Sequence, residues 1–340
     1  AVELATTIKN LGDALRYLEG DKTLQITMSV GIAPFDEDSG DGSRALTTAR
    51  MACDSAKDHG RDRIVVYDEG NLSLIRRNDD MQLVSVIQKA IDSDGFELVA
   101  QPIVRLQPGS AVSHFEVLLR LGENSDTDVS TEGLLSAAER YSMMPQVDRW
   151  VLSRTIAMLA SHMRAIEAAD VKFAINLSGQ SLGDNDMLAF IDNEIRETGV
   201  SAGRLCFEIT ESAAVSNLKK AQAFIDALCF RGARISLDDF GAGLSSFAYL
   251  KNFNVDTLKI DGSFVQDITR NRISESMVAA ITQVAKVMQL ETVAEYVESE
   301  AARKLVMELG VDYAQGHAIG KPMPLKQVLS TLEAQVASTA

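Results

Sequence analysis

The stretch ARISLDDFGAGLSSFAYLKNFNVDTLKID, residues 233–261, decides the fold predicted for this chain. An apolar run over Ile235–Leu237 ends in two adjacent acids, Asp238 and Asp239, and then in a glycine-containing turn. A second short apolar run carries Lys259. This pattern predicts two buried strands that deliver charged side chains to one edge of a sheet.

Two adjacent carboxylates about 4 Å apart repel each other by roughly 4 kcal/mol at an effective dielectric constant near 20. A bound divalent cation would remove this cost, and the pair would then mark a metal site. The alternative is structural, with Asp239 facing solvent and Asp238 capping the following turn. The pair alone leaves both interpretations open.

The chain has 340 residues, of which 46% are hydrophobic, and a net charge of −15. This length suits one large domain with a smaller one. The negative charge disfavours nucleic-acid polymers and anionic membrane surfaces as partners. No apolar run approaches the roughly 18 residues of a spanning helix, and the first ten residues lack the pattern of a signal peptide. We therefore expect a cytoplasmic segment, with any sensor or membrane segment lying further upstream in a longer protein.

Cysteine and histidine usage disfavours disulfides and zinc. Cys53, Cys206 and Cys229 are odd in number and widely spaced, as is typical of reduced thiols in a cytosolic protein. The four histidines show no ligand spacing, so we expect no zinc site.

The periodicity predicts three regions. Residues 1–70 follow a helix, strand, helix, strand order and are too few for a large independent core. The expected ranges are Ala5–Leu18, Leu24–Ala33, Ala45–His59 and Arg63–Tyr67. Residues 71–92 place apolar side chains on one helical stripe, which predicts a connecting helix. Residues 93–340 alternate apolar strands with amphipathic helices, the signature of a sheet wound with helices.

Eight strands are predicted in the third region, which fits a TIM-type (β/α)8 barrel with its chemistry at the carboxyl ends of the strands. Their predicted ranges are Phe96–Arg105, Ser113–Leu121, Val171–Leu177, Arg204–Ile209, Arg234–Asp238, Thr257–Ile260, Thr292–Val297 and Tyr313–Ile319.

Nearly every predicted strand ends in a polar side chain, so these groups would meet at one mouth. They are Glu116, Arg120, Asn176, Glu208, Glu211, Asp238, Asp239, Lys259, Glu295, Glu298 and Gln315. Each has an ordinary explanation alone, such as a turn former or an acid at a helix start. Together, carboxylates and an amide without histidine or thiolate suit Mg²⁺ or Mn²⁺. Two such ions about 3.5–4 Å apart need a bridging carboxylate, and the Asp238–Asp239 pair could supply it.

Eight short motifs, in this order along the chain, resemble the EAL domain, the family of cyclic di-GMP phosphodiesterases. They are QPIV (101–104), EVLLR (116–120), NLS (176–178), FEITES (207–212), DDFGAG (238–243), LKID (258–261), AEYVES (294–299) and QGHAIGKPMP (315–324). The resemblance runs from about Asp92 to the end of the chain.

The resemblance implies a role for each polar group at the mouth. Glu116, Asn176, Glu208 and Asp238 would hold one divalent cation, and Asp238, Asp239 and Glu295 the other. Lys259 would position or deprotonate the attacking water, with Glu116 and Glu298 also in the catalytic set. Gln101, Arg120 and Gln315 would bind the substrate, Glu298 and Gln315 would also hydrogen-bond metal-bound water, and Glu211 would hold the DDFGAG loop.

The implied reaction is metal-dependent hydrolysis of cyclic di-GMP to linear pGpG by in-line attack of an activated water. The alternative is a non-catalytic cyclic di-GMP receptor, as EAL-like domains are when metal ligands or the lysine are lost. No such loss is visible in this sequence. An enzyme acting on another phosphate ester would leave the QPIV and QGHAIGKPMP motifs unexplained. The resemblance also implies a homodimer through the EAL domain.

Several residues depart from the usual EAL pattern, including Val99 and Ala100, which stand where aromatic residues often precede QPIV. Val117 replaces the usual alanine, His317 stands where an aromatic residue is common, and Tyr296 replaces a glycine between Glu295 and Val297. The ring of Tyr296 either stacks on a guanine base or obstructs it.

Residues 26–33 (ITMSVGIA) and 49–68 (ARMACDSAKDHGRDRIVVYD) resemble the second half of a GGDEF domain, the family of cyclic di-GMP synthases. The half with the signature glycines and metal-binding acids is not in this sequence. By this resemblance Lys57 and Arg61 would contact nucleotide phosphates, while the alternative makes them solvated cations at a helix end. We therefore expect an α+β partial GGDEF-like domain over residues 1–70, without assigned activity.

Overall fold

The computed structural model describes the chain except residues 15, 20–21, 26, 35–45, 47–48, 51, 54–55, 57–61, 68–72, 94, 108, 111, 123–129, 243–248 and 340. The described residues form two compact units, Ala1–Leu83 and Val84–Ala340. The division falls inside helix α3 (Ser73–Asp92). Each unit is described separately below.

The first unit combines one helix with two small sheets. Helix α1 (Val2–Ala14) is followed by the antiparallel pair β1 (Arg16–Glu19) and β2 (Lys22–Gln25). Strands β3 (Val30–Ile32) and β4 (Ile64–Val66) pair in parallel. The strand expected over Leu24–Ala33 is therefore divided between two sheets. Lys57, Arg61 and most of the helix expected over Ala45–His59 lie outside the described residues.

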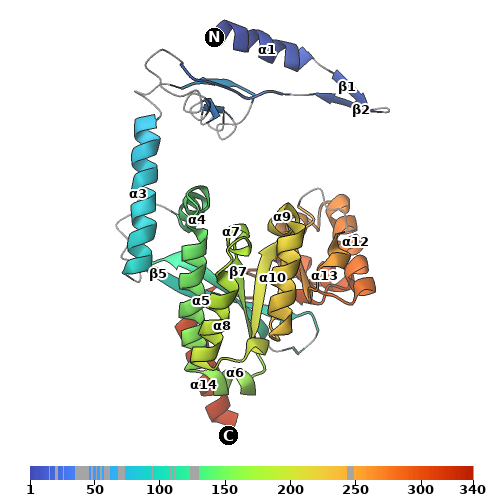
Figure 1. Cartoon of the computed structure of the whole chain (residues 1–340). Coiled ribbons are helices and arrows are strands. Elements are labelled where there is room, and N and C mark those ends of the chain that lie inside the picture. Colours follow the sequence, from blue (N-terminus) through green and yellow to red (C-terminus); the bar gives the residue numbers. More distant parts are fainter. Residues whose placement is uncertain are drawn as a thin grey trace. The chain divides into compact units, whose positions relative to one another are not determined.

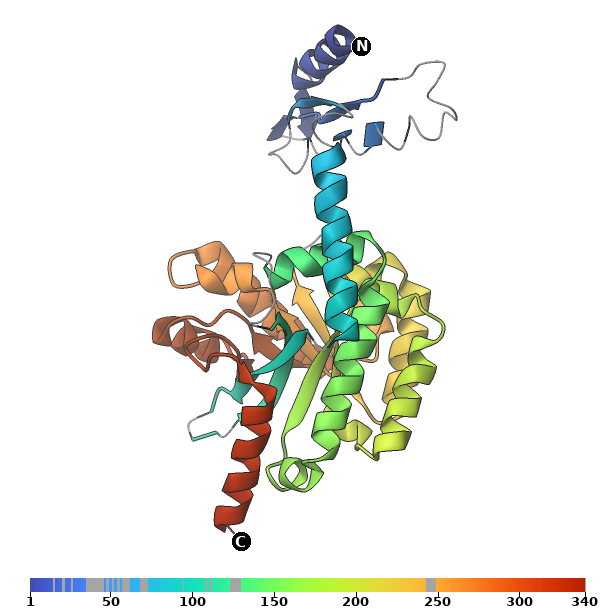
Figure 2. The same cartoon turned by 90° about the vertical axis from the view of Figure 1, so that its left-hand side faces the viewer.

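The second unit contains a closed barrel of eight strands (Figures 1 and 2). Each strand pairs with its neighbours in the chain, and β12 pairs with β5 to close the barrel. The strands are β5 (Phe96–Arg105), β6 (Val112–Leu121), β7 (Lys172–Leu177), β8 (Leu205–Thr210), β9 (Arg234–Phe240), β10 (Thr257–Ile260), β11 (Glu291–Ala294) and β12 (Tyr313–Ala314). A short strand, β13 (Met323–Pro324), adds to β5.

One strand runs against the expected parallel order. Strand β5 is antiparallel to both β6 and β12, whereas the other neighbouring strands of the barrel are parallel. The physical reason is the short connection between Arg105 and Val112, because a parallel crossover needs a dozen or more residues. The hairpin places Gln101 of β5 directly opposite Glu116 of β6.

Helices cover the outside of the barrel (Figures 1 and 2). Helices α7 and α9, which follow β7 and β8, lie at one end of the barrel, and α6, which precedes β7, lies at the other (Figure 1). The helices are α4 (Thr131–Arg140), α5 (Met144–Ala160), α6 (Met163–Ala168), α7 (Gly179–Leu182), α8 (Met187–Thr198), α9 (Glu211–Ser216), α10 (Leu218–Phe230), α11 (Gly262–Gln266), α12 (Arg272–Met288), α13 (Glu300–Glu308) and α14 (Leu325–Thr339).

Successive side chains of each strand point alternately out of and into the barrel. The outward ones form an apolar layer, and the inward ones include polar groups. In β8, Phe207 and Ile209 are fully buried, while Cys206 and Glu208 line a small cavity that all eight barrel strands enclose. This cavity has a volume of about 20 Å³, enough for about one water molecule. The interior is therefore filled by side chains, and the polar ones gather at its ends.

No helix among the described residues is long and apolar enough to cross a membrane.

Truncating a core aromatic should destabilise the barrel far more than the same change on its surface. Phe207 is 0% exposed in β8, and Phe230 is 91% exposed at the end of α10. We expect Phe207→Ala to lower the free energy of unfolding by about 3–5 kcal/mol because it leaves a cavity, and Phe230→Ala to change it by about 0.5 kcal/mol or less. Urea unfolding followed by circular dichroism measures both, and equal losses would contradict this assignment of the core.

Candidate active site

The centre of the site is a buried lysine surrounded by acids from four other strand ends. Lys259 of β10 is 1% exposed, and its Nζ lies within ion-pair distance of four carboxylates. The distances are 2.8 Å to Glu208, 2.9 Å to Glu295, 3.2 Å to Asp238 and 3.3 Å to Glu116. The barrel thus brings together side chains that are up to 179 positions apart in the sequence.

Glu116 of β6 is held by two amides as well as by the lysine. Asn176 donates to its Oε1 at 2.7 Å, and Gln315 donates to its Oε2 at 2.6 Å. Gln315 also donates to the side chain of Gln101 at 3.2 Å, and Gln101 donates to the backbone oxygen of Gly320 at 3.1 Å. These contacts fix the orientation of the Glu116 carboxylate.

Burial and mutual repulsion strongly perturb the acids. Burial raises the pKa of Glu208 well above its usual range, with further repulsion from Glu116 and Asp238 opposing the attraction of Lys259. Burial also raises the pKa of Glu295 to about 8. Burial opposes the charge of Lys259, but the four surrounding carboxylates outweigh it and raise its pKa well above the ordinary value. The cluster therefore favours positive charge at its centre.

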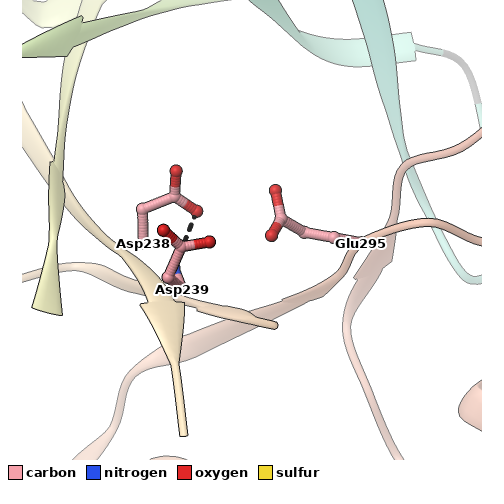
Figure 3. A group of neighbouring side chains, drawn as sticks. All are labelled: Asp238, Asp239 and Glu295. Carbon is pink, nitrogen blue, oxygen red and sulfur yellow. Dashed lines mark hydrogen bonds between the residues drawn. The ribbon is translucent and has the colours of Figure 1, made fainter. Parts of the chain in front are cut away.

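Asp238, Asp239 and Glu295 form a second group at the same mouth. One ligand atom from each lies within 4.8 Å of the others, and Glu295 faces the two aspartates from the opposite side (Figure 3). The backbone N–H of Asp239 donates to Asp238 at 3.0 Å. Asp239 has φ +54°, in the left-handed region that few non-glycine residues adopt. This turn sends the two adjacent acids toward the same space, where burial and repulsion from Asp238 and Asp261 raise the pKa of Asp239.

The donor set fits hard divalent cations. Five carboxylates and one ammonium gather at this mouth, so four negative charges remain uncompensated when all are ionised. The carboxylates belong to Glu116, Glu208, Asp238, Asp239 and Glu295. Two divalent cations would balance them. Oxygen ligands without histidine or thiolate suit Mg²⁺ or Mn²⁺. The buried Oε1 of Gln315 has no hydrogen-bond partner among the described residues, so it has capacity to accept from a metal-associated water.

Glu211 joins the start and end of the segment after β9. It lies in the first turn of α9, is 6% exposed, and accepts from the backbone N–H of Gly241 at 3.0 Å. Its other oxygen accepts from the hydroxyl of Tyr249. Residues 243–248, between these two contacts, lie outside the described part of the chain.

Two predicted site residues stand apart from the acid cluster. Glu298 is exposed and faces His317, whose Nδ1 lies 3.6 Å from its Oε1. Arg120 is exposed on β6, four positions after Glu116 and hence on the same face of the strand. Both are at the rim rather than around Lys259.

Asp148 also supports the site, and its role was not predicted from the sequence. Asp148 of α5 is 5% exposed and accepts from the backbone N–H of Ser178 at 2.9 Å and from the hydroxyls of Ser178 and Ser181, both at 2.6 Å. It fixes the turn two residues after Asn176. Ser178 also caps α7, so the NLS motif carried a capping signal, but nothing in the sequence identified Asp148 as its partner.

Gly316 explains how Gln315 reaches the acids. Its φ is +151°, and a Cβ there would lie 2.3 Å from the backbone nitrogen and oxygen of Val297. The backbone N–H of Gln315 donates to the oxygen of Ala294, and its oxygen accepts from the N–H of Val297, both at 2.9 Å. Only glycine allows this close approach, so the QG dipeptide is a structural requirement.

The fold is an α/β barrel, and a cluster of acids suited to metal ions lies at the carboxyl ends of its strands. These two features define the class of protein. Residues 85–322 match the EAL domain family. The chain belongs to this family, and its second unit contains the matching region.

Relatives and solved structures agree with this assignment. The chain is 37% identical over 255 residues to cyclic di-GMP phosphodiesterase PdeF of Escherichia coli K12, covering 75% of this chain and 34% of that protein. It is 33% identical over 317 residues to cyclic di-GMP phosphodiesterase PdeB of Shewanella oneidensis, covering 93% of this chain and 36% of that protein. The chain therefore spans about a third of the length of these relatives.

Among solved structures, the PaMucR phosphodiesterase in complex with c-di-GMP has a TM-score of 0.68 and 29% identity, covering 73% of this chain and 99% of that one. The FimX EAL domain from Pseudomonas aeruginosa bound to c-di-GMP has a TM-score of 0.64 and 28% identity, covering 71% and 96%.

The raised pKa of Glu295 should make the metal-free chain less stable as pH rises. Between its ordinary value of 4.5 and its folded value of about 8, the folded state binds more protons than the unfolded state. Stability then falls with rising pH, by up to about 1.4 kcal/mol per pH unit for one group. We expect Glu295→Gln to reduce this fall in denaturant titrations at pH 5–9 with chelator present.

The matched control is Glu298→Gln, an exposed glutamate at the same mouth, which should keep the pH dependence of the parent. If the free energy of unfolding falls with pH equally in Glu295→Gln and in the parent, Glu295 does not cause the pH dependence.

Proposed function

We propose that this chain hydrolyses cyclic di-GMP to linear pGpG with two divalent cations, Mg²⁺ or Mn²⁺. The observation that carries the proposal is the cluster of five carboxylates around Lys259 at the mouth of an EAL barrel. The names of the relatives PdeF and PdeB, both cyclic di-GMP phosphodiesterases, support the substrate and the reaction class.

The cations would be held by two sets that share Asp238. Glu116, Asn176 and Glu208 join it in one set, and Asp239 and Glu295 join it in the other. When bound, such cations polarise a phosphoryl oxygen and lower the pKa of an associated water. The chain fixes the ligands beforehand, since the amides of Asn176 and Gln315 already orient Glu116.

Lys259 would position the attacking water and offset negative charge in the transition state. The four carboxylates within 3.3 Å stabilise its ammonium form, which donates hydrogen bonds but accepts no proton. The charge therefore favours a role for Lys259 in positioning the water over a role in deprotonating it. Water attacks phosphorus, the bond to the 3′ oxygen breaks, and a 5′ phosphate and a 3′ hydroxyl result.

The substrate would be held from the rim of the barrel. Arg120 is exposed on the same strand face as Glu116, and a guanidinium grips phosphate oxygens through two parallel bonds. Gln101 and Gln315 line the adjoining pocket with Glu298. The exposed position of Glu298 favours a role in hydrogen-bonding substrate or water over a direct part in the chemistry.

Glu211 would keep the DDFGAG segment in its active position. Its contacts with Gly241 and Tyr249 support this role because they hold the segment at two points. The segment begins with the shared ligand Asp238, so releasing it would disturb both sets of metal ligands.

A non-catalytic cyclic di-GMP receptor is the second candidate function. It would need the same pocket but no metal-assisted chemistry. The complete set of acids and the lysine favours catalysis, because a receptor has no need for five carboxylates beside a bound phosphate.

We further propose that the first unit is the C-terminal part of a GGDEF-like domain over residues 1–70, joined by the helix over residues 71–92 to the EAL domain of residues 93–340. The alignment with PdeB, which covers 93% of this chain, supports an extended relationship beyond the EAL domain. A homodimer through the EAL domain and a cytoplasmic location complete the proposal, in keeping with a soluble second messenger as substrate.

Removing a metal ligand should abolish turnover. We expect the purified chain to release pGpG from cyclic di-GMP with Mg²⁺ or Mn²⁺. We expect Glu116→Ala to lower kcat at least about 100-fold, since replacing a residue that only hydrogen-bonds to a metal ligand already lowers activity or metal affinity about 10–100-fold. Chelator should have the same effect. Product is measured by chromatography.

The control is Glu167→Ala, the same change at an exposed position on α6 at the opposite end of the barrel. It should keep parental turnover. Tight nucleotide binding by the parent without any turnover would instead establish the receptor function.

A further inference from the structure

Tyr296 adopts a backbone conformation that its side chain disfavours. Its φ is +50°, in the left-handed region where aromatic residues are rare. It directly follows Glu295, one of the candidate metal ligands. Backbone strain of this kind persists where the surroundings enforce it, and it concentrates at ligand-binding sites.

The ring lies against a glycine that leaves space for it. A Cβ built at Gly262, the first residue of α11, would lie 2.2 Å from Cδ2 and 2.8 Å from Cγ of Tyr296. One edge of the ring is thus fixed against the α11 backbone. Tyr296 is nevertheless 56% exposed, so much of its side chain remains accessible.

The accessible side chain lines a pocket beside the acid cluster. The pocket has a volume of about 280 Å³, near the lower end of the range for small-molecule sites. Its lining includes Glu116 and Glu295 from the cluster, Gln101 and Gln315, and the rings of Tyr296 and His317. A ligand here would place one end against the acids and another against an aromatic ring. Because the ring borders this open space, it forms a wall of the pocket.

We propose that Tyr296 is a substrate-binding residue whose ring stacks on one guanine base of the cyclic dinucleotide. This inference rests on the proposed function and adds a base-binding wall to it. A base joined through its sugar to a phosphate at the metal ligands matches a pocket that combines acids and a ring. Gly262 is a positioning residue, because it acts only through the ring it accommodates.

The test uses two replacements that accept a left-handed backbone, Tyr296→Gly and Tyr296→Asn. Each removes the ring. Loss of one base-stacking contact should raise Kd and KM for cyclic di-GMP by about 5- to 100-fold, with kcat within about threefold of the parent. Kd is measured with chelator present to prevent turnover, and KM and kcat with Mg²⁺. Phe230→Ala, on the exposed end of α10, is the aromatic control and should match the parent.

A double-mutant cycle separates the ring from the backbone. Gly262→Ala pushes a methyl group into the ring without changing residue 296, so it should also weaken binding. In the Tyr296→Gly background the same change should have no further effect. An equal effect in both backgrounds would overturn the proposal.

The remaining outcomes are also decisive. Unchanged or tighter binding without the ring would overturn stacking, and tighter binding would mean that the ring obstructs the pocket. A shifted Mg²⁺ concentration for half-maximal activity, with Kd unchanged, would assign the ring to the placement of Glu295 instead. If the parent binds but does not hydrolyse the nucleotide, catalysis fails while the Kd series still decides stacking. If the parent neither binds the nucleotide with chelator nor turns it over or binds it with Mg²⁺, both proposals fail.

Discussion

The site depends on one buried ammonium among four largely buried carboxylates. Each acid would be costly to bury alone, and Lys259 offsets part of that cost by contacting Glu116, Glu208, Asp238 and Glu295 within 3.3 Å. One positive charge does not balance the set, and burial together with the remaining repulsion raises the pKa values of Glu208 and Glu295. The remaining negative charge suits the cluster to divalent cations, which take oxygen ligands.

The barrel keeps this cluster in place through contacts outside it. The β5–β6 hairpin sets Gln101 opposite Glu116, and the close approach at Gly316 brings Gln315 to the same carboxylate. Asp148 holds the turn after Asn176, and Glu211 holds the segment after Asp239. A rigid frame of this kind lets acids that repel one another remain at fixed positions.

Two of the non-glycine residues with left-handed backbones lie at the site. They are Asp239, a candidate metal ligand, and Tyr296, which follows the candidate ligand Glu295. At Asp239 the conformation turns two neighbouring acids toward one space, and at Tyr296 it sets a ring at the wall of the pocket. Propensity alone would place neither residue in that conformation, so tertiary contacts must enforce it.

The sequence by itself determined the eight strands, their order and the polar residues at their ends, because alternation and spacing are local properties of the chain. It also supplied the family, which the match over residues 85–322 confirmed. It did not reveal the reversed β5, the partner of Ser178, or the rim positions of Glu298 and Arg120. Only the tertiary structure decided these features. Closure of the barrel determines which side chains meet when they are far apart in the sequence, and a local sequence pattern does not contain that information.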